Sequence, residues 1–96
     1  MADFFLRPKA VADLEGIWDY TVETWSEEQA ERYLRLIDES FHKVADNPGL
    51  GRPCDVIRKD YRKLGVGRHM IFYRETDSGI DVVRVLHERM DVDRHL

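Results

Sequence analysis

The sequence predicts an α+β fold in which an N-terminal strand and a hairpin of two helices pack on a small antiparallel β-sheet. Apolar residues recur at helical spacing through the first half of the chain, and the second half contains three runs typical of strands. The apolar side of each layer has to be buried, so we expect the helices to cover one face of the sheet. Residues 1–96 are expected to form a single domain.

Residues 3–7, with the sequence DFFLR, predict a short first strand, because adjacent aromatic residues favour strands and Pro8 ends the run. A helix is expected to begin at Pro8, since a proline fits the first helical turn, where its missing N–H is not needed. The apolar residues at helical spacing are Val11, Leu14, Ile17, Trp18 and Trp25.

Ser26 is expected to cap a second helix, with Gln29 three residues later completing a capping box. The apolar positions of this helix are Ala30, Tyr33, Leu34, Ile37, Phe41, Val44 and Ala45. The run Asn47-Pro48-Gly49 ends the pattern. Two consecutive amphipathic helices with a tight corner between them predict an αα-hairpin.

A loop rich in glycine and proline precedes three predicted strands at residues 61–66, 68–75 and 80–87. The sequence TDSG between the last two is typical of a hairpin turn, with Gly79 at a positive φ. Gly65 and Gly67 predict a tight bend or bulge between the first two. The last strand contains Val82, Val83, Val85 and Leu86, which predicts burial on both faces and a position inside the sheet.

Charge is distributed unevenly along the chain. Residues 1–50 carry five Lys and Arg against eleven Asp and Glu, a net −6, whereas residues 51–96 carry ten against eight, a net +2, which together give the overall −4. The second half is therefore expected to contact a partner. Direct binding to nucleic acid is not expected, because phosphate attraction depends on accumulated Lys and Arg.

The chain has one cysteine, Cys54, and no apolar run of the ~20 residues that a membrane helix needs. The first ten residues lack the positively charged start of a signal peptide. A single cysteine forms no intrachain disulfide, so a reducing cytoplasm is the expected location, without membrane contact.

Metal-binding side chains gather near the C-terminal end. His87, Asp91, Asp93 and His95 are residue types that bind metals, but their spacing is not that of a known metal site. Ordinary surface ion pairs explain the same residues. We expect neither a metal nor another cofactor.

Catalytic residues are less evident. Cys54 has no base in its own segment and is not expected to act as a nucleophile. A ribonuclease can act without a metal or a cysteine, and Arg68, Arg84 and His87 could supply its positive charge and proton carrier. The favoured interpretation is simpler: the arginines pair with nearby acids and His87 ends a strand.

Aromatic residues concentrate on the predicted hairpin, at Trp18, Tyr20, Trp25 and Tyr33. Most of them are expected in the core. A domain of this size cannot bury every one, and an exposed remainder would form a docking patch for an apolar segment of a partner.

Over residues 4–96 the chain resembles the ParE toxins of bacterial type II toxin–antitoxin modules, within the RelE/ParE superfamily. The resemblance is carried by a set of short motifs in a fixed order. These are Trp18-Asp19-Tyr20, Gly51-Arg52-Pro53, Gly67-Arg68-His69, Phe72-Tyr73-Arg74 and the closing Leu86-His87-Glu88-Arg89-Met90-Asp91. The family fold, a helical hairpin on a small antiparallel sheet, agrees with the prediction made from the residues.

The resemblance implies a toxin that inhibits DNA gyrase, breaks no bond itself, and is neutralised by a ParD-like ribbon-helix-helix antitoxin. An amphipathic helix of the antitoxin would dock on the helical hairpin, where Trp18, Tyr20, Trp25 and Tyr33 are the candidate contacts. The candidate target-binding residues lie in the C-terminal run, at His87, Arg89, Met90, Arg94 and His95.

Two alternatives stay open. The RelE branch of the superfamily cleaves mRNA on the ribosome, and Arg68, Arg84 and His87 would be its catalytic residues here. The net charge of −4 and the absence of a tyrosine after Tyr73 argue against this activity. The other alternative is an inactive toxin that is retained as an antitoxin-binding module.

Overall fold

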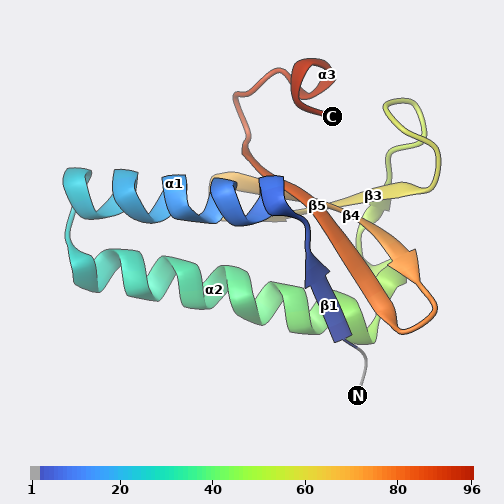
Figure 1. The fold of residues 1–96 in the computed structure, drawn as a ribbon, viewed down its shortest axis with the longest axis horizontal. Coiled ribbons are helices and arrows are strands. Elements are labelled where there is room, and N and C mark those ends of the chain that lie inside the picture. Colours follow the sequence, from blue (N-terminus) through green and yellow to red (C-terminus); the bar gives the residue numbers. More distant parts are fainter. Residues whose placement is uncertain (1–2) are drawn as a thin grey trace.

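A computed structural model describes residues 3–96 as a five-stranded mixed sheet with a hairpin of two long helices packed on one face (Figure 1). The elements are β1 (Asp3–Leu6), α1 (Pro8–Thr24), α2 (Glu27–Asp46), the short 3-10 turn η1 (Pro48–Leu50), β2 (Arg52–Pro53), β3 (Tyr61–Val66), β4 (His69–Thr76), β5 (Gly79–His87) and α3 (Val92–His95). The strand order is β1-β5-β4-β3-β2. The predicted α+β architecture is confirmed.

One pairing differs from the predicted antiparallel sheet. Strands β2 to β5 pair antiparallel, but β1 runs parallel to β5, from Asp3 opposite Gly79 to Leu6 opposite Val82. Both long helices lie between β1 and the later strands in the chain. A long connection of this kind lets two strands pair in the same direction, which a tight hairpin cannot do.

The helix signals in the sequence are confirmed at both starts. Pro8 occupies the first turn of α1, and the Ser26 hydroxyl accepts the N–H of Gln29 at the start of α2 (3.1 Å). The buried faces of the two helices meet the helix-facing side of the sheet. This main core consists of Ala10, Ile17, Ile37, Phe41, Val44, Ala45, Val66, Ile71, Tyr73, Ile80, Val82 and Val85.

The hairpin turns follow the glycine pattern. Gly79 has the predicted positive φ (154°) in the β4–β5 turn, and Gly67 (57°) makes the predicted tight bend between β3 and β4. The register of β3 and β4 is regular around this bend, so no bulge lies there. A bulge is found in the β4–β5 ladder instead, where Tyr73 faces Val82 and Phe72 faces Arg84.

The loop before β3 is attached to the sheet by Tyr73. Its hydroxyl donates to the carbonyl of Pro48 (2.6 Å) and accepts the N–H of Gly51 (2.8 Å). A Cβ at Gly51 would collide with this hydroxyl and with the carbonyl of Lys63. Two of the motifs that carry the family resemblance, Gly51-Arg52-Pro53 and Phe72-Tyr73-Arg74, therefore contact each other.

The face of the sheet away from the helices has a smaller core of its own. Cys54, Phe72 and Leu86 are buried there, and partly buried residues pack around them. Two of these, Val92 and Leu96, come from the C-terminal segment, which leaves β5 and ends in α3, apart from α1 and α2 (Figure 1). As predicted, β5 is buried on both faces and lies inside the sheet.

Within residues 3–96, no helix has the length and apolarity to span a membrane.

Candidate functional site

The four aromatic residues of the helical hairpin do not form one patch. Trp25, the residue that follows α1, is 71% exposed, and Tyr20 is 67% exposed. Trp18 is half-buried. At 3.6 residues per turn, Trp18 lies on the same flank of α1 as Trp25, whereas Tyr20 is close to the opposite flank. Figure 1 shows the α1–α2 corner, where Trp25 lies, extending well past the sheet.

Tyr33 has a structural role that the other three aromatic residues lack. It is half-buried, and its hydroxyl accepts the backbone N–H of Arg68 (3.0 Å) and lies 3.3 Å from the carbonyl oxygen of Val66. The same hydroxyl lies 2.6 Å from Nδ1 of His69. Burial is the main cause that raises the pKa of the Tyr33 phenol. Tyr33 thus fixes the β3–β4 turn against α2.

A row of three rings crosses this end of the sheet. The His69 ring packs between Tyr33 (ring centroids 5.4 Å apart) and His87 (5.2 Å, edge to face). Burial, followed by the neighbouring His87, lowers the pKa of His69. The backbone N–H of Arg89 donates to Nδ1 of His87 (3.1 Å), so neutral His87 carries its proton on Nε2. His69 was visible in the sequence only as part of the motif Gly67-Arg68-His69, because only the strand register shows that it faces His87.

The three candidate nuclease residues do not converge. Arg68 and His87 lie at the same end of the sheet, where the N–H of Glu88 donates to the carbonyl of Arg68 (2.9 Å). Arg84 lies three residues before His87 on β5 and faces Phe72 of the smaller core. Side chains three apart on a strand point to opposite faces. Arg84 therefore lies on the other side of the sheet from His87 and Tyr33.

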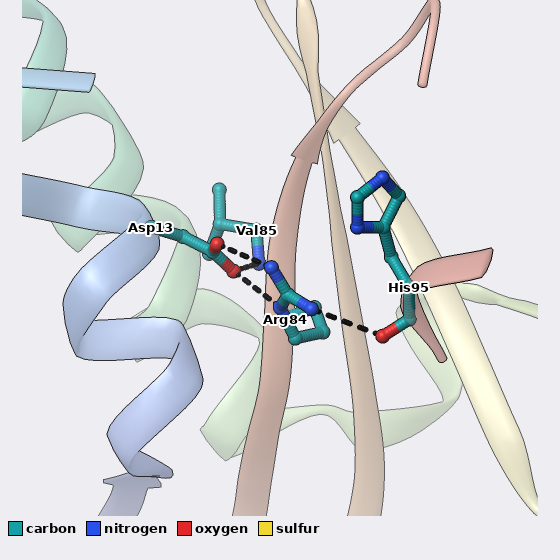
Figure 2. Close-up of polar contacts among 4 residues, drawn as sticks. All are labelled: Asp13, Arg84, Val85 and His95. Atoms are coloured by element: carbon teal, nitrogen blue, oxygen red, sulfur yellow. Dashed lines mark hydrogen bonds and ion pairs between the residues drawn. The ribbon is translucent and has the colours of Figure 1, made fainter. Parts of the chain in front are cut away.

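Arg84 pairs with an acid, as the simpler interpretation expects. Its Nε and Nη2 donate to the two carboxylate oxygens of Asp13 on α1 (2.8 and 2.7 Å), and its Nη1 donates to the carbonyl of His95 (3.0 Å; Figure 2). The Arg84 and Asp13 side chains are only 15% and 13% exposed. The hydrogen bond to Asp13 is the main cause that raises the pKa of Arg84.

A basic cleft of about 450 Å³ lies next to this pair, between the start of α1 and the C-terminal segment. Its lining is Arg7, Pro8, Lys9, Arg58, Tyr61, Val83, Arg84, His95 and Leu96. Three of the four Lys and Arg side chains already have a partner: Arg7 is near Asp81 (3.4 Å), Arg84 binds Asp13, and Arg58 donates to the main-chain oxygen of Leu96 (2.5 Å). Much of the positive charge of the cleft is thus engaged within the chain.

The C-terminal segment has two kinds of residue. Val92 and Leu96 pack on the smaller core, and His87 and His95 are half-buried. The remaining target-binding candidates point outward: Arg89 and Met90 are exposed, and the Arg94 side chain is 83% exposed. The segment is therefore held on the sheet by its apolar residues, while Arg89, Met90 and Arg94 are exposed to solvent.

The other residues considered from the sequence are placed as follows. Among residues 3–96, no group of three or more His, Cys, Asp or Glu side chains is arranged to hold a metal ion. The Asp91 side chain accepts the N–H of Asp93 at the start of α3 (3.1 Å). Cys54 is buried, and this burial raises the pKa of its thiol, which makes the reactive thiolate less available.

Comparison with known proteins decides the family. A family model described as "ParE toxin of type II toxin-antitoxin system, parDE" matches residues 4–92. The chain belongs to the ParE toxin family. A relative named Toxin ParE1, from Mycobacterium tuberculosis (strain ATCC 25618 / H37Rv), is 55% identical over 94 residues, which are 97% of this chain and 96% of the relative.

Two further ParE relatives agree with this assignment. A Toxin ParE1 from Caulobacter vibrioides is 36% identical over 96 residues, covering 100% of this chain and 99% of the relative. A solved structure described as the chromosomal ParDE TA system from P. aeruginosa matches with a TM-score of 0.77 and 26% identity, covering 91% of this chain and 96% of that one. The predicted family and the ParE fold are confirmed, and the chain is the toxin component of a type II toxin–antitoxin system with a ParD-like partner.

Sequence reasoning missed one residue of this site. Asp13 is not among the residues singled out from the sequence, yet its carboxylate binds both Arg84 and the backbone N–H of Val85 (2.9 Å). Its separation of 71 residues from Arg84 leaves no local pattern to read. One feature of the sequence could have pointed to Asp13. It is an acid in the second turn of the helix that directly follows β1, and β1 is an edge strand of the sheet.

Proposed function

We propose that this ParE-family toxin binds DNA gyrase through its C-terminal segment, residues 87–96, and inhibits supercoiling. The observation that carries the proposal is the way this segment is presented. Val92 and Leu96 are turned onto the sheet, while Met90 is 45% exposed and the Arg94 side chain 83% exposed. Basic residues combined with an exposed apolar side chain are typical of a surface that binds another protein.

A non-enzymatic mode of action has separate support. Arg84, whose side chain is only 15% exposed, is engaged by Asp13 and by the C-terminal segment, and it faces away from His87. A catalytic group has to come within hydrogen-bond reach of the same substrate as its partners. Among the described residues this trio does not meet that condition, which favours occupation of a target surface over cleavage of RNA.

The antitoxin would bind elsewhere, on the helical hairpin. The exposed rings of Trp25 and Tyr20 supply the apolar area that an amphipathic helix needs. Because these residues lie on different flanks of α1, one straight helix cannot cover both. The ParD-like antitoxin would therefore contact the α1–α2 corner with a segment that bends around it.

Purified gyrase provides the decisive assay. Toxin is titrated into a supercoiling reaction with relaxed plasmid, and we expect inhibition by the wild-type chain. A Met90→Ala/Arg94→Ala variant should lose it. The control is an Arg35→Ala/Leu36→Ala variant, which removes the same kinds of side chain from α2, where Leu36 is 46% exposed, and should inhibit normally. Full supercoiling at saturating wild-type toxin would rule out gyrase as the target.

A bacterial strain in which expression of the toxin can be induced separates the alternative functions. New mRNA ends at codon positions on stalled ribosomes, detected by primer extension after induction, would instead identify a RelE-like ribonuclease. Normal growth without any antitoxin would identify an inactive antitoxin-binding module. Restored growth on co-expression of the ribbon-helix-helix protein from the adjacent reading frame would support the antitoxin assignment.

A further inference from the structure

Strand β1 covers only part of the edge of β5. Beyond the end of β1, a side chain of α1 binds the backbone of β5 at this edge. β1 pairs with β5 only as far as Val82, and the N–H of Arg7 makes the last contact, to the Val82 carbonyl (3.1 Å). The chain then enters α1. In the second turn of this helix, the Asp13 carboxylate accepts the N–H of Val85 (2.9 Å), so it takes the place that the next residue of a longer β1 would have had.

The same carboxylate orients Arg84. Two nitrogens of the guanidinium bind the two oxygens of Asp13, at 2.8 and 2.7 Å, in the planar bidentate arrangement that suits arginine and carboxylate. This leaves Nη1 pointing to the far side, where it donates to the carbonyl of His95 (Figure 2). A guanidinium has the fixed fork that allows one side chain to bind both partners at once, whereas the ammonium of lysine does not.

The C-terminal segment depends on such contacts for its position. α3 has four residues, and an isolated helix this short is not stable in water. Val92 and Leu96 place the segment on the sheet, but apolar contact is not directional. Among the described residues, the directional contacts from elsewhere in the fold to the main chain of residues 92–96 come from Arg84, at His95, and from Arg58, at Leu96. Of these two arginines, Arg84 is the one held by a buried carboxylate.

We propose that Asp13 and Arg84 are positioning residues for target binding: Asp13 fixes the Arg84 guanidinium, and Arg84 holds the C-terminal segment in the orientation that presents Met90 and Arg94. This inference rests on the proposed function in one respect, because it takes this segment to be the target-binding element. It does not depend on gyrase being the target.

Two variants of the full chain test the inference, with a matched control. Arg84→Lys keeps a positive charge beside Asp13 but cannot also reach His95, and Asp13→Asn keeps the shape of the acid but removes its charge. The control is Asp81→Asn, which alters another ion pair on β5, with Arg7 (3.4 Å), and leaves the contacts of Arg84 and Arg58 to His95 and Leu96 in place. Because Arg84→Lys keeps the positive charge and a side chain of similar length, it keeps the test valid if Asp13→Asn fails to fold.

Two readouts are compared: amide hydrogen exchange of residues 92–96 and growth arrest on induction without antitoxin. Both test variants should increase exchange in this segment by about tenfold, the change expected when a hydrogen bond to a charged group is lost. Exchange at Ile71 in the sheet should stay near wild type in Arg84→Lys. Growth arrest should weaken in both test variants and persist in Asp81→Asn.

Unchanged exchange in residues 92–96 of Arg84→Lys would overturn the inference, and so would increased exchange with full growth arrest. Failure of the gyrase proposal gives a different result. The wild-type chain would then arrest growth while purified gyrase stays active, and the variants would still differ from the control. A wild-type chain that arrests no growth would overturn both.

Discussion

The Tyr33 hydroxyl lies 2.6 Å from Nδ1 of His69, and this contact joins the second turn of α2 to the first residue of β4. The His69 ring is held on its other side by His87. A positive charge on His69 would therefore be placed in a half-buried site next to a second imidazole. Both conditions favour the neutral ring, so the fold prefers His69 without its extra proton.

This preference predicts a loss of stability in mild acid. Because the pKa of His69 is lower in the folded chain than its ordinary value of 6.5, the unfolded chain binds the proton more readily. The contribution of His69 is present above about pH 6.5 and is lost as the pH falls through its folded pKa. Urea unfolding between pH 7.5 and 5 should show this decrease, and a His69→Gln variant should show less of it.

His42→Gln is the control for the pH experiment, because the His42 side chain is 61% exposed on α2. The decrease in stability between pH 7.5 and 5 should be smaller in His69→Gln than in His42→Gln. A His69→Gln chain with the same pH dependence as wild type would show that the acid sensitivity comes from other groups.

Tyr73→Phe should destabilise the fold by about 1–3 kcal/mol, because the change leaves the buried N–H of Gly51 and the carbonyl of Pro48 without their partner. In a domain of this size that corresponds to a decrease in Tm of several degrees. Tyr20→Phe is the control, since it removes the same hydroxyl from a side chain that is 67% exposed. Equal Tm values for the two variants would contradict the anchoring role of Tyr73.

The sequence predicted those parts of the fold that depend on local signals. Pro8 and Ser26 mark helix starts through the chemistry of one turn, and Gly79 marks a hairpin through its backbone conformation. The direction of β1 was not predictable in the same way. Its pairing with β5 brings together residues about 76 positions apart, and only the packing of both helices determines the side of the sheet on which β1 arrives.

In the candidate site, too, the sequence predicted what depends on local signals and not what depends on long-range packing. The residue types of the C-terminal run were visible in the sequence, but its placement on the sheet depends on Phe72 and Leu86, which form a second small core with Val92 and Leu96. The partner of Arg84 was expected only as an unnamed nearby acid. Asp13 could be identified only once α1 was placed beside the edge of β5.

Gly67→Ala should destabilise the β3–β4 turn. Gly67 has a φ of +57°, which alanine adopts only with strain, and a Cβ there would collide with the Tyr33 ring. We expect a loss of about 1–3 kcal/mol and faster amide exchange at Arg68. Gly65→Ala is the matched control two residues earlier, where the nearest atom to a Cβ is Sδ of Met70 at 3.9 Å. A Gly67→Ala chain as stable as Gly65→Ala would refute this account.

Trp25→Ala and Trp18→Ala should separate antitoxin binding from stability. Trp25 is 71% exposed, so its replacement should change the free energy of unfolding by less than about 0.5 kcal/mol. Trp18 is half-buried and should cost more. If the α1–α2 corner is the docking site, Trp25→Ala alone should weaken binding of the antitoxin encoded in the adjacent frame, measured by calorimetry. Unchanged affinity would remove Trp25 from the interface.

Deletion of residues 92–96 tests whether the C-terminal segment serves the fold as well as the target. Phe72 and Leu86 are each 1% exposed, and Val92 and Leu96 supply part of their cover. Exposing part of two large apolar side chains should cost about 1–3 kcal/mol, which is less than the stability of a typical domain. The truncated chain should therefore fold with a lower Tm, still bind the antitoxin through the hairpin, and no longer inhibit gyrase. A chain that unfolds completely would mean that the smaller core is essential, and one that still inhibits gyrase would move the target-binding surface to another part of the molecule.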